Sequence, residues 1–172
     1  MRKPSAKRER RTNHLTRKFV AEMSQKAKKS AEFVSGMTGL PNRRAFDERS
    51  TSPFVATCDV NNLKPTNDRF GYSVGDMLIR RFAEVLTSVG LDAYHHLGGT
   101  FLCKGESYQE LNVKLSETRQ ILRQQPFSVY DVDGRVIAIE STEFSFGIGS
   151  NVEEAELSLS HQKKLRTPET AR

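Results

Sequence analysis

The residues of this chain best suited to chemistry come directly after a short apolar run, Phe54–Cys58. That run is rich in β-forming residues and stops at Asp59, so we expect a buried strand that ends in a carboxylate. The segment that follows is polar and rich in glycine, with Asn61, Asn62, Lys64, Asn67, Asp68, Gly71, Gly75 and Asp76. Amides and carboxylates can hydrogen-bond the edges of a base, while lysine and helix N-termini favour phosphate. These residues therefore predict a nucleotide site.

A structural interpretation competes with this one. Asn and Asp side chains often satisfy the backbone of turns, and Asp76 directly precedes an apolar-periodic segment that predicts a helix. The apolar residues of that helix are Met77, Leu78, Phe82, Val85 and Leu86. On composition alone, a capped loop before this helix is the more common explanation.

The rest of the chain shows further strand and helix patterns, as expected of one α/β domain with a modest core. Residues 93–103 predict two short strands around Gly98-Gly99, which favours a hairpin turn. The later patterns predict a helix over 106–125, a hairpin over 127–139, a strand over 142–149 and a helix over 151–165.

The order of the polar residues resembles that of a known family. Asp59-Val60-Asn61-Asn62-Leu63-Lys64, Asn67-Asp68, Gly71-Tyr72 and Gly75-Asp76 are similar to the pattern of the GGDEF domain family, the diguanylate cyclases. The resemblance extends to Met37–Phe46, the family's first motif, and to Ser145–Ile148, its late strand. Several motifs in one order are far more specific than any single motif. The resemblance implies an α/β (α+β) sandwich of the nucleotidyl-cyclase-like palm type: a central, mostly antiparallel sheet flanked by helices, with an N-terminal basic helix.

The resemblance also implies roles for individual residues. The implied nucleotide-binding residues are Lys64, Asn67, Asp76 and Lys163. Among them, Asn67 and Asp76 match the residues that read the guanine edge, and Lys163 lies where a lysine contacts phosphate. Asp59 matches a metal-binding aspartate, so the implied ligands of Mg2+ are Asp59 and the Val60 carbonyl.

The sequence departs from the family at the Gly-Gly turn. Family members carry two acids there, which join the first-strand aspartate in holding two magnesium ions, whereas this chain has Gly98-Gly99-Thr100-Phe101-Leu102. In an ungapped alignment, Thr100 and Phe101 replace both acids. With one residue deleted, Phe101 keeps the role of the family phenylalanine and the hairpin is one residue shorter, which reverses the side chains that face the core. Both alignments remove the second metal-binding acid and leave no confident catalytic residue.

Phosphoryl transfer requires divalent ions to neutralise the triphosphate, and magnesium requires several hard oxygen ligands. One carboxylate would hold Mg2+ weakly. We therefore expect a degenerate, catalytically impaired diguanylate cyclase-like domain of cyclic di-GMP signalling, which retains guanine-nucleotide (GTP) binding or acts as a regulatory or interaction module. The alternatives are an active cyclase, which would join two GTP molecules in a homodimer, and an adaptor that works through a basic arm.

That arm holds most of the positive charge. The whole chain carries +6, but residues 1–30 hold eleven Lys or Arg and two Glu, so the remainder is mildly acidic. An apolar residue recurs every four positions at Leu15, Phe19, Met23, Ala27 and Ala31, which predicts an amphipathic helix. We expect a basic disordered tail and this helix over 1–34, a GGDEF-like domain over 35–165 and a loose tail over 166–172. The arm can dock or self-pair through its apolar stripe, or bind nucleic acid or an anionic membrane surface.

No apolar run in the sequence approaches the ~20 residues that span a bilayer, and the basic N-terminus lacks the apolar core of a signal peptide. We therefore expect a cytoplasmic protein without a transmembrane segment. Cys58 and Cys103 lie in apolar, strand-like runs, and in a reducing compartment we expect both to be unpaired core residues.

Overall fold

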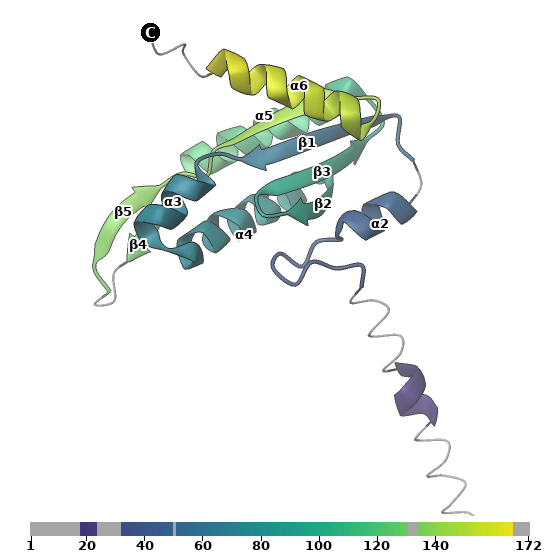
Figure 1. Ribbon diagram of the computed structural model, residues 1–172, viewed down its shortest axis with the longest axis horizontal. Helices are drawn as coiled ribbons and strands as arrows, with labels where there is room; N and C mark the ends of the chain where they lie inside the picture. Colours follow the sequence, from purple (N-terminus) through teal and green to yellow (C-terminus); the bar gives the residue numbers. More distant parts are fainter. Residues whose placement is uncertain (1–17, 24–31, 50, 131–133, 167–172) are drawn as a thin grey trace, which may run out of the picture.

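The computed structural model describes residues 18–23, 32–49, 51–130 and 134–166. Its centre is a four-stranded antiparallel sheet in the order β2-β3-β1-β6 (Figure 1). The strands are β1 (Phe54–Val60), β2 (Asp92–Leu97), β3 (Thr100–Gly105) and β6 (Phe144–Gly149). A separate two-stranded sheet pairs β4 (Phe127–Tyr130) with β5 (Val136–Glu140). Because β1 lies between β3 and β6, residues of both neighbours flank its end.

Helices α4 (Tyr72–Ser88) and α5 (Tyr108–Gln124) pack against one face of the sheet and form the main core with it. Phe82 of α4 lies in this core, with its ring centroid 5.0 Å from that of Phe101 and 4.6 Å from that of Phe144. Cys58 and Cys103 are buried here as free thiols, which confirms their predicted place in the core. Burial raises the pKa of the Cys58 thiol well above its usual value, so this residue stays protonated and acts as a small apolar side chain.

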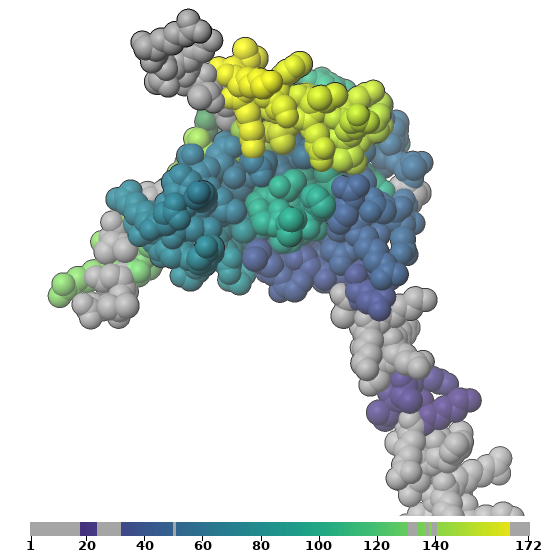
Figure 2. Space-filling model, in the orientation of Figure 1, coloured from purple at the N-terminus to yellow at the C-terminus, as the bar shows by residue number. Residues whose placement is uncertain are grey.

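Helices α2 (Arg43–Glu48) and α6 (Val152–Arg166) lie on the opposite face. In Figure 2, the surface of α6 runs along one side of the molecule, beside the surfaces of β1 and the β2–β3 hairpin. The backbone of α6 approaches β6 so closely that a Cβ at Gly147 would overlap the main chain of Ala155 and Leu159. This close packing fixes the position of the last turn of α6, which carries Lys163.

The segment after β1 is helical rather than a loop. Residues 63–70 form α3 (Leu63–Phe70), and α4 begins at Tyr72, so Asp76 lies in the second turn of α4. The N-cap of α4 is Gly71, whose φ of 87° is a conformation that favours glycine. The interpretation of Asp76 as a helix cap is therefore wrong, and the break between the two helices is at Gly71.

The predicted fold class is confirmed, with a mostly antiparallel sheet flanked by helices. The hairpins predicted over 93–103 and 127–139 and the helices predicted over 106–125 and 151–165 are present, with small shifts at their ends. Of the tail and helix predicted over 1–34, the structure describes residues 18–23, which form an exposed helix, and residues 32–34, which form a turn and an isolated bridge between Val34 and Pro41 rather than a helix. The rest of residues 1–31, residue 50, residues 131–133 in the second hairpin and residues 167–172 lie outside the described residues.

Candidate functional site

The end of β1 brings together polar side chains from three strands. In the sheet register, Asp59 lies opposite Thr100 of β3 on one side and Ser145 of β6 on the other. These three residues alternate with the residues of the main core, so they lie on the face that α6 covers. Lys163, in the last turn of α6, reaches the same point. Four separate elements therefore build this site.

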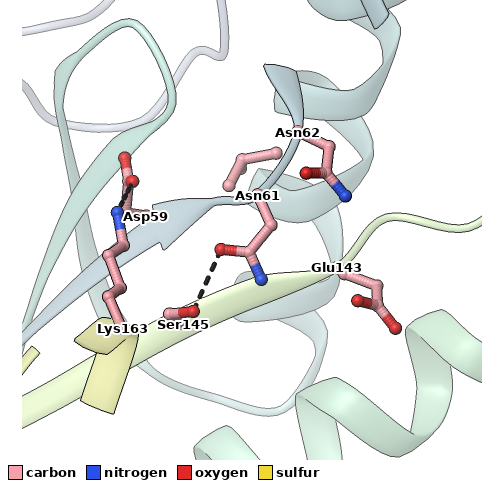
Figure 3. Close-up of a pocket in the computed structure, with 7 residues that line it drawn as sticks. Asp59, Asn61, Asn62, Glu143, Ser145 and Lys163 are labelled. Atoms are coloured by element: carbon pink, nitrogen blue, oxygen red, sulfur yellow. Dashed lines mark hydrogen bonds and ion pairs between the residues drawn. The ribbon is translucent and has the colours of Figure 1, made fainter. Parts of the chain in front are cut away.

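Two groups of the chain itself hold Asp59, and Figure 3 shows one of them, Lys163. Its Oδ2 atom forms an ion pair with the Lys163 ammonium group, and its Oδ1 atom accepts a 3.2 Å hydrogen bond from the Thr100 hydroxyl. The Asp59 side chain is 29% exposed and that of Lys163 is 43% exposed. Partial burial reduces screening by water and salt, so this pair attracts more strongly than a fully exposed one. Both carboxylate oxygens are therefore engaged.

A cleft of about 610 Å³ opens beside this pair. Its lining is mostly polar and consists of Asp59, Val60, Asn61, Asn62, Glu143, Ser145 and Lys163. Ser145 donates a 3.0 Å hydrogen bond to Oδ1 of Asn61. Figure 3 shows Glu143 pointing away from Asp59, and its carboxylate lies 3.9 Å from the guanidinium of Arg123 on α5. The two carboxylates of this cleft therefore do not converge on one point.

A second cleft, of about 570 Å³, adjoins the first, and the two share Asp59, Val60 and Asn62. The remaining lining comes from α3 and the start of α4: Leu63, Lys64, Pro65, Asn67, Asp68 and Tyr72. The Oδ1 atom of Asn67 is buried and has no hydrogen-bond partner among the described residues. An unsatisfied buried acceptor costs roughly 1–3 kcal/mol. This atom packs against Gly75 of α4, where an added Cβ would overlap it.

The predicted nucleotide-binding residues are divided between the two clefts. Lys64 and Asn67 line the second cleft, and Lys163 lines the first. Asp76 is not part of either lining, and its carboxylate lies 3.8 Å from the guanidinium of Arg80 one turn further along α4. The predicted metal ligands, Asp59 and Val60, lie where the clefts meet. The structure thus brings together all of the predicted site residues except Asp76.

The residues at the end of β1 do not fit a pair of magnesium ions. Within the part of the chain that the structure describes, no three Asp, Glu, His or Cys side chains come close enough to hold a metal. Asp59 faces an ammonium group and a hydroxyl where two ions would need further carboxylates. A divalent ion would also have to displace Lys163, whose positive charge repels it.

The β2–β3 turn places Thr100 and Phe101 on opposite faces of the sheet. Leu97 pairs with Thr100 across Gly98-Gly99, and Phe101 is fully buried against Phe82. Thr100 lies on the face of the site, while Phe101 lies on the face of the main core.

Sequence reasoning assigned no site role to several residues that line the clefts, among them Glu143 and Tyr72. Glu143 comes directly before β6, and its main-chain carbonyl accepts a 2.8 Å hydrogen bond from the Asn61 N–H. The available signal was its position before a strand, but it becomes useful only once β6 is known to pair with β1. Tyr72, which is 80% exposed, had no signal beyond its place in the family-like pattern.

Comparisons with known proteins agree with this architecture. Residues 33–97 match the family model "Diguanylate cyclase, GGDEF domain". The diguanylate cyclase DgcP of Escherichia coli is 33% identical over 118 residues, covering 59% of this chain and 34% of that protein. The chain is also 41% identical over 69 residues to an uncharacterized protein in the hutH 5' region of Streptomyces griseus, covering 34% of this chain and 29% of that one. This chain carries a GGDEF family domain.

The match of the GGDEF domain to the family model ends at Leu97, directly before Gly98-Gly99. A solved structure of the coiled coil and GGDEF domain of DgcB from Caulobacter crescentus, in complex with c-di-GMP, has a TM-score of 0.70 to this chain. It is 19% identical and covers 94% of this chain and 92% of that one, so it shows the shared fold. The chain spans about a third of the length of the two curated relatives. None of the described helices is long and apolar enough to cross a membrane.

Proposed function

We propose that this GGDEF domain binds a guanine nucleotide as a regulatory or interaction module and makes little or no cyclic di-GMP. The observation that carries the proposal is the cleft of about 570 Å³, whose lining combines the Lys64 ammonium group with the Asn67 amide and the Asp68 carboxylate. The base-pairing edge of guanine carries two neighbouring N–H donors, so guanine suits a lining that offers amide and carboxylate oxygens. GGDEF diguanylate cyclases use GTP and Mg2+, which makes GTP the first ligand to test.

The impaired catalysis follows from charge. Joining two GTP molecules requires divalent ions that neutralise the triphosphates and activate the attacking hydroxyl. At the end of β1, Asp59 is paired with Lys163 and Thr100 instead of further carboxylates. Loss of one member of a group that acts as a unit lowers rates by ~10³ or more. A domain with this constellation retains a place for the base and loses the means to activate the phosphates.

Two further functions remain proposals. An active cyclase would require a homodimer, since each subunit offers one GTP. An adaptor function would rest on the basic residues 1–30, of which the structure describes 18–23. The measurements below distinguish the active cyclase from the binding module. Deletion of residues 1–30 distinguishes both from the adaptor, because nucleotide binding by the domain should survive the deletion, whereas binding of nucleic acid or an anionic surface through the arm should be lost.

The proposal is tested by calorimetric titration of the full chain with GTP and with ATP. We expect GTP to bind more tightly than ATP, and Asn67→Ala to weaken GTP binding by about 5- to 150-fold, because loss of a hydrogen-bond partner costs ~1–3 kcal/mol. The matched control is Asn112→Ala, on α5 and outside both clefts, which should leave GTP binding unchanged. Absence of GTP binding up to millimolar concentration would refute the proposal.

Mass spectrometry of the protein incubated with GTP and Mg2+ or Mn2+ measures the cyclase activity directly. We expect no cyclic di-GMP above the level of an Asp59→Ala variant. Robust turnover by the purified protein that disappears in Asp59→Ala would show an active cyclase instead.

A further inference from the structure

We propose that Lys163 acts as the resident cation of the first cleft, so that the phosphates of the nucleotide bind directly to its ammonium group and need no divalent ion. The inference rests on the proposed nucleotide binding and adds to it the way in which the phosphates are held. The residues around Asp59 differ from the magnesium-binding residues that the family resemblance implies, and this difference is the basis of the proposal.

The first step concerns the charge at Asp59. A magnesium ion at this carboxylate would replace the Lys163 contact at Oδ2 and the Thr100 hydrogen bond at Oδ1. It would then keep one protein carboxylate, because Glu143 points away and pairs with Arg123 (Figure 3). Magnesium sheds its water reluctantly and prefers several hard oxygen ligands, so this exchange is unfavourable. Lys163 already supplies a positive charge at the same point.

The second step concerns the path of the ligand. The two clefts meet at Asp59, Val60 and Asn62, so a nucleotide whose base lies beside Asn67 can extend toward Lys163. An ammonium group carries three N–H donors and can bridge a carboxylate and a phosphate. The Lys163 side chain is 43% exposed and lines the cleft, so a phosphate can approach it. The chemical class of the ligand is therefore a guanine nucleotide whose polyphosphate carries no metal.

Removal of the Asp59 charge distinguishes this mechanism from a metal-dependent one, because the two predict opposite changes in nucleotide affinity. When a magnesium ion bridges protein and phosphate, loss of the Asp59 charge weakens binding. When Lys163 holds the phosphate, Asp59 competes for the ammonium group and repels the ligand, so Asp59→Asn should strengthen binding. Removal of one like charge at a distance of about 4 Å in water changes affinity about fivefold.

The experiment is a calorimetric titration of the full chain with GTP and with a non-hydrolysable GTP analogue, each in excess Mg2+ and in excess EDTA. We expect affinities in the two buffers to agree within about threefold, Lys163→Gln to weaken binding about tenfold or more, and Asp59→Asn to strengthen it about fivefold in EDTA. Lys164→Gln is the matched control, because Lys164 is the neighbouring exposed lysine of α6 and lines neither cleft. It should change affinity by less than about twofold.

The outcomes separate the two proposals. Binding that appears in Mg2+ and is lost in EDTA overturns the role of Lys163 while the proposed nucleotide binding stands. The role of Lys163 is equally overturned if Lys163→Gln behaves like Lys164→Gln. Absence of binding in both buffers overturns the proposed function itself, and the inference with it. Since the comparison of the two buffers uses the unaltered chain, it decides whether nucleotide binding needs a divalent ion even if a variant fails to fold.

Discussion

Replacement of Gly75 by alanine tests the contact that fixes the Asn67 side chain in the second cleft. Gly75 is a buried residue inside α4, and alanine at such a helix position is normally stabilising by ~1 kcal/mol. Here a Cβ atom at residue 75 would overlap the Asn67 side chain and lie 3.1 Å from Cδ1 of Leu63. The structure therefore predicts that Gly75→Ala destabilises the domain.

The size of the effect follows from these two terms. Insertion of a methyl group into a filled space costs ~1–3 kcal/mol, against which the helix gains ~1 kcal/mol. We expect Gly75→Ala to lower the free energy of unfolding by up to ~2 kcal/mol. In an Asn67→Ala background the obstructing amide is absent, so the same replacement should be neutral or stabilising. The coupling energy between the two positions should then be ~1–3 kcal/mol.

Urea unfolding of the four variants of this double-mutant cycle, followed by far-UV circular dichroism, measures the coupling. The chain has no tryptophan, so helix content is a better signal than fluorescence. Titration of Gly75→Ala with GTP provides a second measurement, because displacement of Asn67 should weaken binding at the same time. A coupling energy below ~0.5 kcal/mol would refute the reasoning, since independent sites add within that limit.

Two further predictions concern the opposite face of the sheet. Gly147→Ala should destabilise the domain by ~3 kcal/mol or more, because its methyl group would overlap the backbone of α6, where no side chain can rotate away. Gly36→Ala is the control, because a Cβ at residue 36 would meet no atom within 4 Å. An equal shift of the urea midpoint in both variants would contradict the close packing of α6 on β6. Burial lowers the pKa of Lys104, whose Nζ donates 2.8 Å and 3.2 Å hydrogen bonds to the carbonyls of Phe46 and Arg49. Between the lowered pKa and the usual value of 10.5, the unfolded chain binds more protons than the folded one, so the contribution of Lys104 to the free energy of unfolding should rise with pH in that window. Lys104→Met should remove this rise in urea unfolding measured at several pH values. An unchanged slope of the free energy of unfolding against pH would contradict the prediction.

The sheet and the long helices were predictable from the sequence because their apolar residues recur with a clear period. Helix α3 was not. It has eight residues, of which only Thr66 is buried, and its large apolar residues are Leu63 and Phe70 at its two ends, which is too few to show a helical period. It also contains Pro65 and Asn67, which favour turns elsewhere, although proline is tolerated in a first helical turn. Tertiary packing against α4 therefore decides the structure of this segment, and local preference predicts a loop.

The candidate site was predictable in its residues and not in its contacts. Asp59 follows from the abrupt end of an apolar strand, and Lys163 follows from the family resemblance. Their ion pair joins residues that are 104 positions apart, so no local pattern reports it. The places of Glu143 and Ser145 depend on the pairing of β6 with β1, which a single sequence does not specify.

Thr100, the first residue of β3, links the charge at Asp59 to the catalytic capacity of the site. Thr100 lies opposite Asp59 in the sheet, so an acid at this position would place two carboxylates side by side and favour a multivalent cation between them. With threonine there, a hydroxyl donates to Asp59, and the single remaining negative charge is matched by the single positive charge of Lys163. A neutral pair offers a divalent ion little attraction while its lysine can still attract phosphate. In the proposed mechanism, loss of the metal and loss of catalysis therefore have one physical cause. Recognition of a base beside Asn67 depends on the packing of α3 against Gly75, so it can persist without metal binding and without catalysis.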